Sequence, residues 1–291
     1  MQIVNRAARH AVALETTLLV HGVPNATARP LAQELNAIVE AQGASPALVG
    51  VVNGAPTVGM TPGELDALLS ADTVAKANTA NLGVLMSRGQ HAATTVSATM
   101  ELAASAGVRL FATGGLGGVH PGYGQHLDIS SDLAAFTRFP VAVVTSGVKS
   151  ILDVRSTREA LETLGVPVVG YRTDAFPAFY LRESDAGVDA RFDDPDELTT
   201  FVHDELARTG RGIVIANPIP EPDEIDPADW SRWLELAQQE ADEAGATGRD
   251  RTPALLASLP TLSAGRTLAA NLALVRSNAA LAARLAAPAP H

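Results

Sequence analysis

The amino-acid sequence predicts an α/β fold, a three-layer α/β/α arrangement with a mostly parallel mixed central sheet. Short apolar segments of strand length alternate along the 291 residues with longer segments that have helical apolar spacing. Glycine, proline and helix-capping residues separate the two kinds of segment. This repeated order is typical of a parallel sheet covered by helices on both faces. No fixed-period repeat or linker interrupts it, so we expect one domain over residues 1–291, with a frayed tail over 286–291.

The first half of the chain begins this alternation. Strands are expected over three short apolar segments: 11–19, 47–52 and 108–113. Helices are expected over 27–42, 95–106 and 131–137, and from residue 61 onward. Thr61, Pro62 and Glu64 give the last of these the pattern of a capping box. A glycine-rich loop over 114–124 follows the third strand.

The second half continues in the same order. Strands are expected over 141–145, 168–171 and 212–216. Helices are expected over 149–164, 195–209, 227–244 and 268–287. Asp194 and Pro195 mark one helix start as an N-cap and a first-turn proline. Ligands of such folds bind beyond the carboxyl ends of the strands, so polar residues that follow strands are the candidates for a site.

Composition narrows the class of function. The formal net charge is −11, whereas a nucleic-acid-binding protein usually carries a basic surface. Cysteine is absent, which excludes disulfides, thiolate metal sites and a cysteine nucleophile. No apolar run approaches the roughly 20 residues that span a bilayer, and the N-terminus lacks a signal-peptide pattern. We therefore expect a cytoplasmic protein.

Lysine is used sparingly in this chain. Of the 21 lysine and arginine residues, only Lys76 and Lys149 are lysines. Arginine stays protonated in proteins, so an amine nucleophile or imine-forming group has to be a lysine. Lys149 follows an apolar strand and a glycine, where a partly dry site would favour a neutral amine. The alternatives are a solvated helix-start lysine for Lys149, and an anion-binding or an ordinary surface lysine for Lys76.

Two polar residues stand in apolar segments. Glu15 lies in a strand segment, so it is expected either to act as a general acid with a raised pKa or to pair with an arginine. Asn271 lies on an otherwise apolar helix face. It would either read the amide-like edge of a ring or be a satisfied core residue.

The glycine-rich loop leads into a third group of candidates. It contains His120 and is followed by Asp128-Ile-Ser130-Ser131-Asp132. Glycines let backbone amides approach an anion, and the helix start at Ser130 and Ser131 favours phosphate. Asp128 and Asp132 could hold a hard cation through oxygen ligands. Helix capping by these aspartates and serines is the alternative.

Eight stretches, in this order and spacing, resemble the pseudouridine-5′-phosphate glycosidase family, and together they run from about residue 11 to 285. They are Ala-Leu-Glu15-Thr-Thr-Leu-Leu-Val-His-Gly-Val-Pro, Ala-Thr94-Thr-Val-Ser-Ala-Thr-Met, Phe-Ala-Thr113-Gly-Gly-Leu-Gly-Gly-Val-His120, Asp128-Ile-Ser-Ser-Asp132-Leu, Gly-Val-Lys149-Ser-Ile-Leu-Asp, Gly-Tyr-Arg-Thr-Asp-Ala-Phe-Pro-Ala-Phe-Tyr180, Val-Ile-Ala-Asn217-Pro-Ile-Pro and Ala-Asn271-Leu-Ala-Leu-Val.

The resemblance implies an α/β/α fold, a homotrimer and a divalent metal ion, typically manganese. It implies a lyase that reversibly cleaves the C–C glycosidic bond of pseudouridine 5′-phosphate to give uracil and ribose 5-phosphate. It also implies that Lys149 is the nucleophile and forms an imine with the sugar, that Glu15 is the proton donor, and that Asp128 is the metal-linked aspartate. The residues at the family's substrate-binding positions are Lys76, Val96, Thr113, His120, Ser130, Ser131, Asp132 and Asn271.

Four segments depart from the family's usual pattern. Asn78-Thr-Ala-Asn81 replaces Ser-Arg-Arg-Asp, Pro121-Gly-Tyr-Gly124 replaces Arg-Gly-Ala-Glu, Thr145-Ser-Gly-Val148 replaces Cys-Ala-Gly-Ala, and Ala175 replaces an acid. The residues expected to bind the sugar and form the imine are kept, whereas polar residues around them are lost. The resemblance therefore leaves the identity of the aglycone undecided. One alternative is a C-glycosynthase that joins ribose 5-phosphate to an aromatic, polyketide-type acceptor. A second is a non-catalytic homologue that binds sugar phosphates.

Overall fold

The structure, a computed structural model, describes residues 2–245 and 251–288. Its sheet is built from the strands β1 Val4–Asn5, β2 Ala11–Glu15, β3 Ser45–Val52, β4 Ala55–Val58, β5 Ala75–Ala77, β6 Ala92–Thr94, β7 Leu110–Ala112, β8 Ala142–Thr145, β9 Val168–Tyr171, β10 Ala190–Phe192 and β11 Ile213–Ala216. Their order across the sheet is β1-β4-β3-β2-β7-β8-β11-β9-β10, and β5 and β6 extend it from β3.

The sheet is mixed and mostly parallel, as predicted. Among the pairs formed by the described strands, only β3–β4 and β3–β6 are antiparallel. The central strands β7, β8 and β11 consist wholly of buried residues, as expected of parallel strands that are covered on both faces. Because β2, β7, β8 and β11 run parallel to their neighbours, their carboxyl ends lie at one edge of the sheet.

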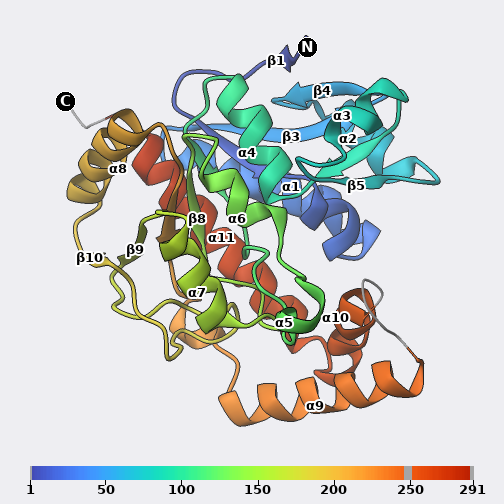
Figure 1. Cartoon of the computed structure of the whole chain (residues 1–291). Coiled ribbons are helices and arrows are strands. Elements are labelled where there is room, and N and C mark those ends of the chain that lie inside the picture. Colours follow the sequence, from blue (N-terminus) through green and yellow to red (C-terminus); the bar gives the residue numbers. More distant parts are fainter. Residues whose placement is uncertain (1, 246–250, 289–291) are drawn as a thin grey trace.

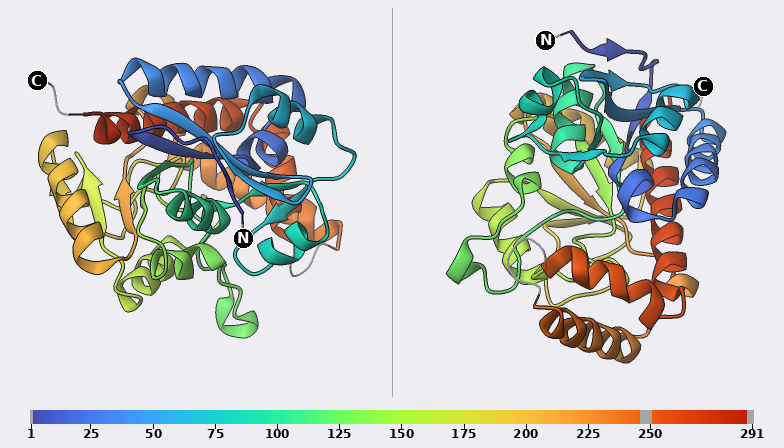
Figure 2. Two further views of the ribbon diagram at one scale, coloured as in Figure 1. Left: turned by 90° about the horizontal axis from the view of Figure 1, so that it is seen from above. Right: turned by 90° about the vertical axis from the view of Figure 1, so that its right-hand side faces the viewer.

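Helices cover both faces of the sheet, which confirms the three layers (Figure 1, Figure 2). On one face, α1 Asn25–Ala41 packs against β3 and against α11 Arg266–Ala286, and α11 crosses β2, β7 and β8. On the other face, α4 Val96–Ser105 packs against β2 and β3 and against α6 Ser131–Phe136. At the sheet edge, α8 Pro195–Thr209 contacts β10 and α11.

The remaining helices lie around this body. They are α2 Pro62–Ser70, α3 Leu82–Ser87, α5 Tyr123–His126, α7 Val154–Thr163, α9 Pro227–Glu243 and α10 Arg251–Leu262, with the short turns η1 Leu18–Gly22 and η2 Glu221–Asp223. Figure 1 shows α9 and α10 side by side at the lower end of α11, and α10 contacts both α9 and α11. The sequence did not predict α10. None of the described helices is long and apolar enough to cross a membrane.

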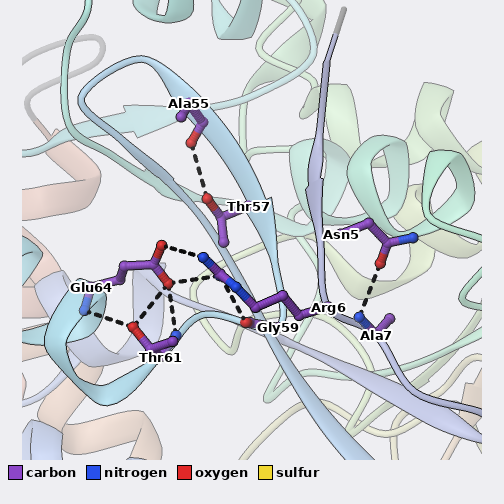
Figure 3. Close-up of polar contacts among 8 residues, drawn as sticks. All are labelled: Asn5, Arg6, Ala7, Ala55, Thr57, Gly59, Thr61 and Glu64. Atoms are coloured by element: carbon purple, nitrogen blue, oxygen red, sulfur yellow. Dashed lines mark hydrogen bonds and ion pairs between the residues drawn. The ribbon is translucent and has the colours of Figure 1, made fainter.

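The predicted capping box at the start of α2 is present (Figure 3). The Thr61 hydroxyl accepts a hydrogen bond from the Glu64 amide at 3.3 Å, and the Glu64 carboxylate accepts one from the Thr61 amide at 2.8 Å. Arg6 donates two further hydrogen bonds to the same carboxylate, at 2.9 and 3.0 Å. These bonds tie the N-terminal segment to α2. Burial alone would raise the pKa of Glu64, but the hydrogen bonds from Thr61 and Arg6 and the positive charge of Arg6 lower it.

Two predicted boundaries were wrong in ways that affect the site. The strand expected over 11–19 ends at Glu15, because the chain turns into a π-helical turn, η1, three residues later. The helix expected from Lys149 begins at Val154, with the Asp153 side chain as its N-cap. Lys149 therefore lies in a turn between β8 and α7. Of the tail expected over 286–291, Ala286 is still helical, and residues 289–291 lie outside the described residues.

Candidate active site

Polar residues from separate strands meet at the carboxyl edge of the sheet, where ligands of such folds bind. Glu15 is the last residue of β2, Lys76 lies on β5, and Lys149 follows β8 by four residues. These three side chains and Asn271 of α11 line one cavity of about 190 Å³. A wider hollow of about 670 Å³ lies at the amino ends of the strands, away from these groups.

The turn that carries Lys149 depends on Gly147. This glycine has φ +80°, and a Cβ atom added to it would lie 1.7 Å from the Pro177 carbonyl oxygen, so no other residue fits there without movement. The Lys149 amide donates to the Leu116 carbonyl at 3.0 Å, and the Phe179 amide donates to the Ser146 carbonyl at 2.9 Å. The backbone of Lys149 is thus fixed against the glycine loop, and its side chain extends into the cavity.

Glu15 has the environment of a proton donor. Burial raises the pKa of this carboxyl above its ordinary value of 4.5. The charge of Lys149 and a short hydrogen bond from the Thr113 hydroxyl to Glu15 Oε1 act in the opposite direction, and Asp132 raises the pKa further. The sequence predicted that Glu15 would either act as a general acid or pair with an arginine. No arginine of the described residues is among the groups that shift its pKa. Because Thr113 occupies Oε1, the other oxygen, Oε2, is left to hold an acidic proton.

Two further basic residues, Lys76 and His21, line the same cavity. Burial lowers the pKa of Lys76, the positive charge of Lys149 lowers it further, and Glu15 partly offsets both effects. His21, at the end of the π-helical turn η1, also lines the cavity. Burial and the charge of Lys76 lower its pKa, so its imidazole is neutral at neutral pH. His21 was not predicted from the sequence as a site residue.

Gly117 and Gly118 of the glycine loop pack closely against other parts of the protein, whereas Gly114 and Gly115 line the cavity. Asp132, only 3% exposed, accepts hydrogen bonds from the Gly117 amide and the Ser97 amide, both at 2.9 Å. The Val119 amide donates to the Thr157 hydroxyl at 2.9 Å. Cβ atoms at Gly117 and Gly118 would collide with side chains of α6 and α7. These glycines therefore permit close protein packing, which places Asp132 behind the loop.

A cluster of hydroxyl groups lies where the first turns of α4 and α6 meet. The Ser97 hydroxyl lies 3.2 Å from the Thr95 hydroxyl and 3.0 Å from that of Ser131. Ser130 is the N-cap of α6, its hydroxyl accepting from the Asp132 amide at 3.2 Å. Val96, the first residue of α4, is 1% exposed, so its side chain is not available to a ligand. The N-termini of α4 and α6 and these four hydroxyls suit an oxyanion.

His120 and Asp128 lie on a separate arm of the chain, 120–130, that carries α5 and projects from the body in Figure 2. His120 Nδ1 lies 3.8 Å from Asp128 Oδ2, and the Asp128 side chain is 53% exposed. In the part of the chain that the structure describes, no three His, Cys, Asp or Glu side chains converge as a metal site would require. Asp128, with His120 nearby, is therefore the residue of this arm that could contribute a carboxylate to a metal ion.

Asn271 faces the cavity with an unsatisfied group. Its side-chain oxygen is buried and has no hydrogen-bond partner in the described structure. A buried polar atom without a partner costs stability, so this oxygen is suited to accept a hydrogen bond from a ligand. The same cavity is also lined by the apolar residues Leu18, Leu256, Leu259, Pro260 and Leu268.

The chain was compared with known proteins. Residues 3–288 match the family described as indigoidine synthase A like protein. A pseudouridine-5′-phosphate glycosidase of Methylobacterium nodulans is 47% identical over 94% of this chain and 82% of its own, and one of Geobacillus kaustophilus is 45% identical over 94% and 92%.

Solved structures agree with the sequence comparisons. An indigoidine synthase A like protein of Thermotoga maritima has a TM-score of 0.89 at 36% identity, covering 98% of this chain and 95% of its own. The prealnumycin C-glycosynthase AlnA, solved with ribulose 5-phosphate, has a TM-score of 0.88 at 34% identity, covering 95% and 90%. The predicted resemblance is confirmed: the chain belongs to the family of pseudouridine-5′-phosphate glycosidases and indigoidine synthase A like proteins.

Proposed function

We propose that this protein is a lyase that reversibly cleaves pseudouridine 5′-phosphate to uracil and ribose 5-phosphate through an imine on Lys149. One observation carries the proposal: a lysine and a carboxyl with a raised pKa line one small cavity at the carboxyl edge of the sheet. Curated relatives that are 47% and 45% identical to the chain bear the name of this activity.

The groups suit the chemistry in the following order. The Lys149 amine bonds to C1′ as the C1′–O4′ bond breaks, and O4′ takes a proton, which opens the sugar ring. Glu15 then donates the proton on Oε2 to the base carbon that was joined to C1′. The nitrogen lone pair forms the C=N bond as the C1′–C bond breaks, and uracil leaves. Water hydrolyses the imine, which returns the free lysine and releases ribose 5-phosphate.

The 5′-phosphate is proposed to lie at the hydroxyl cluster between α4 and α6, within reach of Lys76. The strand β5 that carries Lys76 pairs with β6, whose last residue directly precedes Thr95. Hydroxyls, helix N-termini and a lysine are the groups that commonly bind a phosphate. In this arrangement Asn271, which lines the cavity with a buried, unpaired oxygen, is the residue proposed to contact the base.

A homotrimer and a metal ion at Asp128 are also proposed, both on the strength of the family. The arm that carries Asp128 bears three exposed apolar side chains, Tyr123, Leu127 and Ile129, a feature of protein contact surfaces. Light scattering of the purified protein tests the oligomer. Titration with Mn²⁺, read by paramagnetic resonance for the wild type and Asp128→Asn, tests the metal site without relying on activity.

A second candidate, a C-glycosynthase, is favoured by the apolar wall of the cavity. Five apolar residues from η1, α10 and α11 line the cavity together with Asn271, and an aromatic acceptor larger than uracil would bury against them. Both candidates use the same imine and differ in the aglycone.

Uracil release from pseudouridine 5′-phosphate separates these readings, with Lys149→Arg as the matched control because it keeps the charge and removes the nucleophile. We expect uracil from the wild type and none from the variant. Absence of uracil at high enzyme concentration, together with a ribose 5-phosphate adduct, would favour the C-glycosynthase. Binding of ribose 5-phosphate without any adduct would indicate the non-catalytic homologue.

A further inference from the structure

We propose that Asn278 is a positioning residue that holds both Glu15 and the turn before Lys149 in place for the reaction, an inference that rests on the proposed function. Asn278 lies on α11 and is completely buried. It is two turns along the helix from Asn271, behind the wall of the cavity. Since α11 crosses β7 and β8, its side chain reaches the ends of both strands.

The hydrogen bonds of Asn278 determine how its amide is oriented. The side-chain nitrogen donates to the Thr113 carbonyl at 2.7 Å and lies 3.1 Å from the Ser146 hydroxyl. A carbonyl oxygen can only accept, so the nitrogen must face Thr113. The side-chain oxygen then accepts from the Asn217 amide nitrogen at 2.9 Å. All polar atoms of Asn278 are therefore satisfied by residues at the ends of β7, β8 and β11.

The bonds from Asn278 to Thr113 and to Ser146 each connect it to a reacting group. Thr113 is held through its carbonyl by Asn278 and, through its hydroxyl, holds Glu15 Oε1. Ser146 begins the turn that passes through Gly147 to Lys149, and its hydroxyl also donates to the Asn217 carbonyl at 2.9 Å. The Asn278 amide thus holds Thr113, which positions the acid Glu15, and Ser146, which begins the turn to the amine of Lys149.

The same bonds would also serve a purely structural role, which is to anchor α11 to the sheet. Asn217 provides the control, because it is buried in the same network and bonds to Asn278 and to Ser277 at 3.0 Å. Truncation of Asn217 to alanine loses these side-chain bonds and leaves the bond from Asn278 to Thr113 intact. Both variants, Asn278→Ala and Asn217→Ala, therefore weaken the anchoring of α11 to the sheet. Only Asn278→Ala also breaks the bond that positions Thr113.

The experiment measures kcat, KM and their pH dependence for uracil release by both variants. We expect Asn278→Ala to lower kcat by about 10- to 100-fold with little change in KM, because small misplacements of reacting groups are costly. Its high-pH limb should also move upward, since a loosened Thr113 no longer lowers the pKa of Glu15. The charges that face Glu15, those of Lys149, Asp132 and Lys76, stay the same. Asn217→Ala should keep the wild-type kcat and pH profile.

Equal kcat and equal pH profiles in the two variants would overturn the inference. If Asn278→Ala fails to fold, Asn278→Asp keeps the acceptor for Asn217 and loses the donor to Thr113. The double variant Asn278→Asp with Thr113→Val should lose much less kcat than the product of the two single losses, because both changes break the same connection from Asn278 through Thr113 to Glu15. Fully additive losses in free energy would contradict the inference. If the wild type releases no uracil, the proposed function fails instead, and the rate of adduct formation with ribose 5-phosphate replaces kcat in this comparison.

Discussion

Substitution of Gly147 by alanine tests whether the turn before Lys149 sets the position of the nucleophile. The added carbon would lie 1.7 Å from the Pro177 carbonyl oxygen, whereas such contacts essentially never fall below 3.0 Å. The turn or the carbonyl must therefore move by more than about 1 Å. A displacement of this size costs on the order of 100-fold in rate when reacting atoms are aligned. We expect kcat for uracil release to fall at least that far.

The matched control is Gly210→Ala. Gly210 also has positive φ, +63°, but an added Cβ would meet nothing within 4 Å, and the residue ends α8 far from Lys149. Gly210→Ala should lose about 1–2 kcal/mol of unfolding free energy from the left-handed backbone, and Gly147→Ala should lose this and more because of the added clash, as measured by urea denaturation. Only Gly147→Ala should lose activity. A Gly147→Ala enzyme with kcat within a few-fold of the wild type would refute the reasoning.

Three further predictions concern single groups of the cavity. Glu15→Gln should lower kcat by about 10²- to 10⁴-fold and abolish the high-pH limb of the wild type, on which activity falls as Glu15 loses its proton. Because the pKa of Glu15 is raised by folding, the wild type should lose stability as pH rises above about 4.5 relative to Glu15→Gln, as thermal denaturation at pH 5 and pH 8 would show; equal shifts would exclude a buried carboxyl. Lys76→Met should raise KM for the sugar phosphate by about 10- to 100-fold, and an unchanged KM would place the phosphate elsewhere. Asn271→Leu should weaken uracil release while adduct formation with ribose 5-phosphate continues, whereas equal loss of both would argue against a base-reading role.

The layers of the fold could be predicted from the sequence because buried parallel strands are short apolar runs. β8, β9 and β11 were expected within a residue of their observed bounds. The short strands β1, β4, β5, β6 and β10 were missed, since two to four residues carry too little periodicity to distinguish a strand from a loop. α10 was missed because Pro260 inside it indicates a helix end.

The site was predictable where chemistry restricts the choice of residue. Lys149 and Lys76 stood out as the two lysines of the chain, and Glu15 as an acid in an apolar strand; the structure brings all three to one cavity. Asn278 was missed, although it is a polar residue on a buried helix face like Asn271, which was selected. Its role depends on which strand ends α11 crosses, and only the assembled fold determines that.

Covalent capture of the sugar tests the central claim most directly. The protein is incubated with ribose 5-phosphate and borohydride, digested, and mapped by mass spectrometry, with Lys149→Arg and Lys76→Arg treated in parallel. An imine on Lys149 predicts one reduced adduct, on Lys149, that persists in Lys76→Arg and disappears in Lys149→Arg. An adduct on Lys76 alone, or a wild type that releases uracil without any adduct, would contradict it.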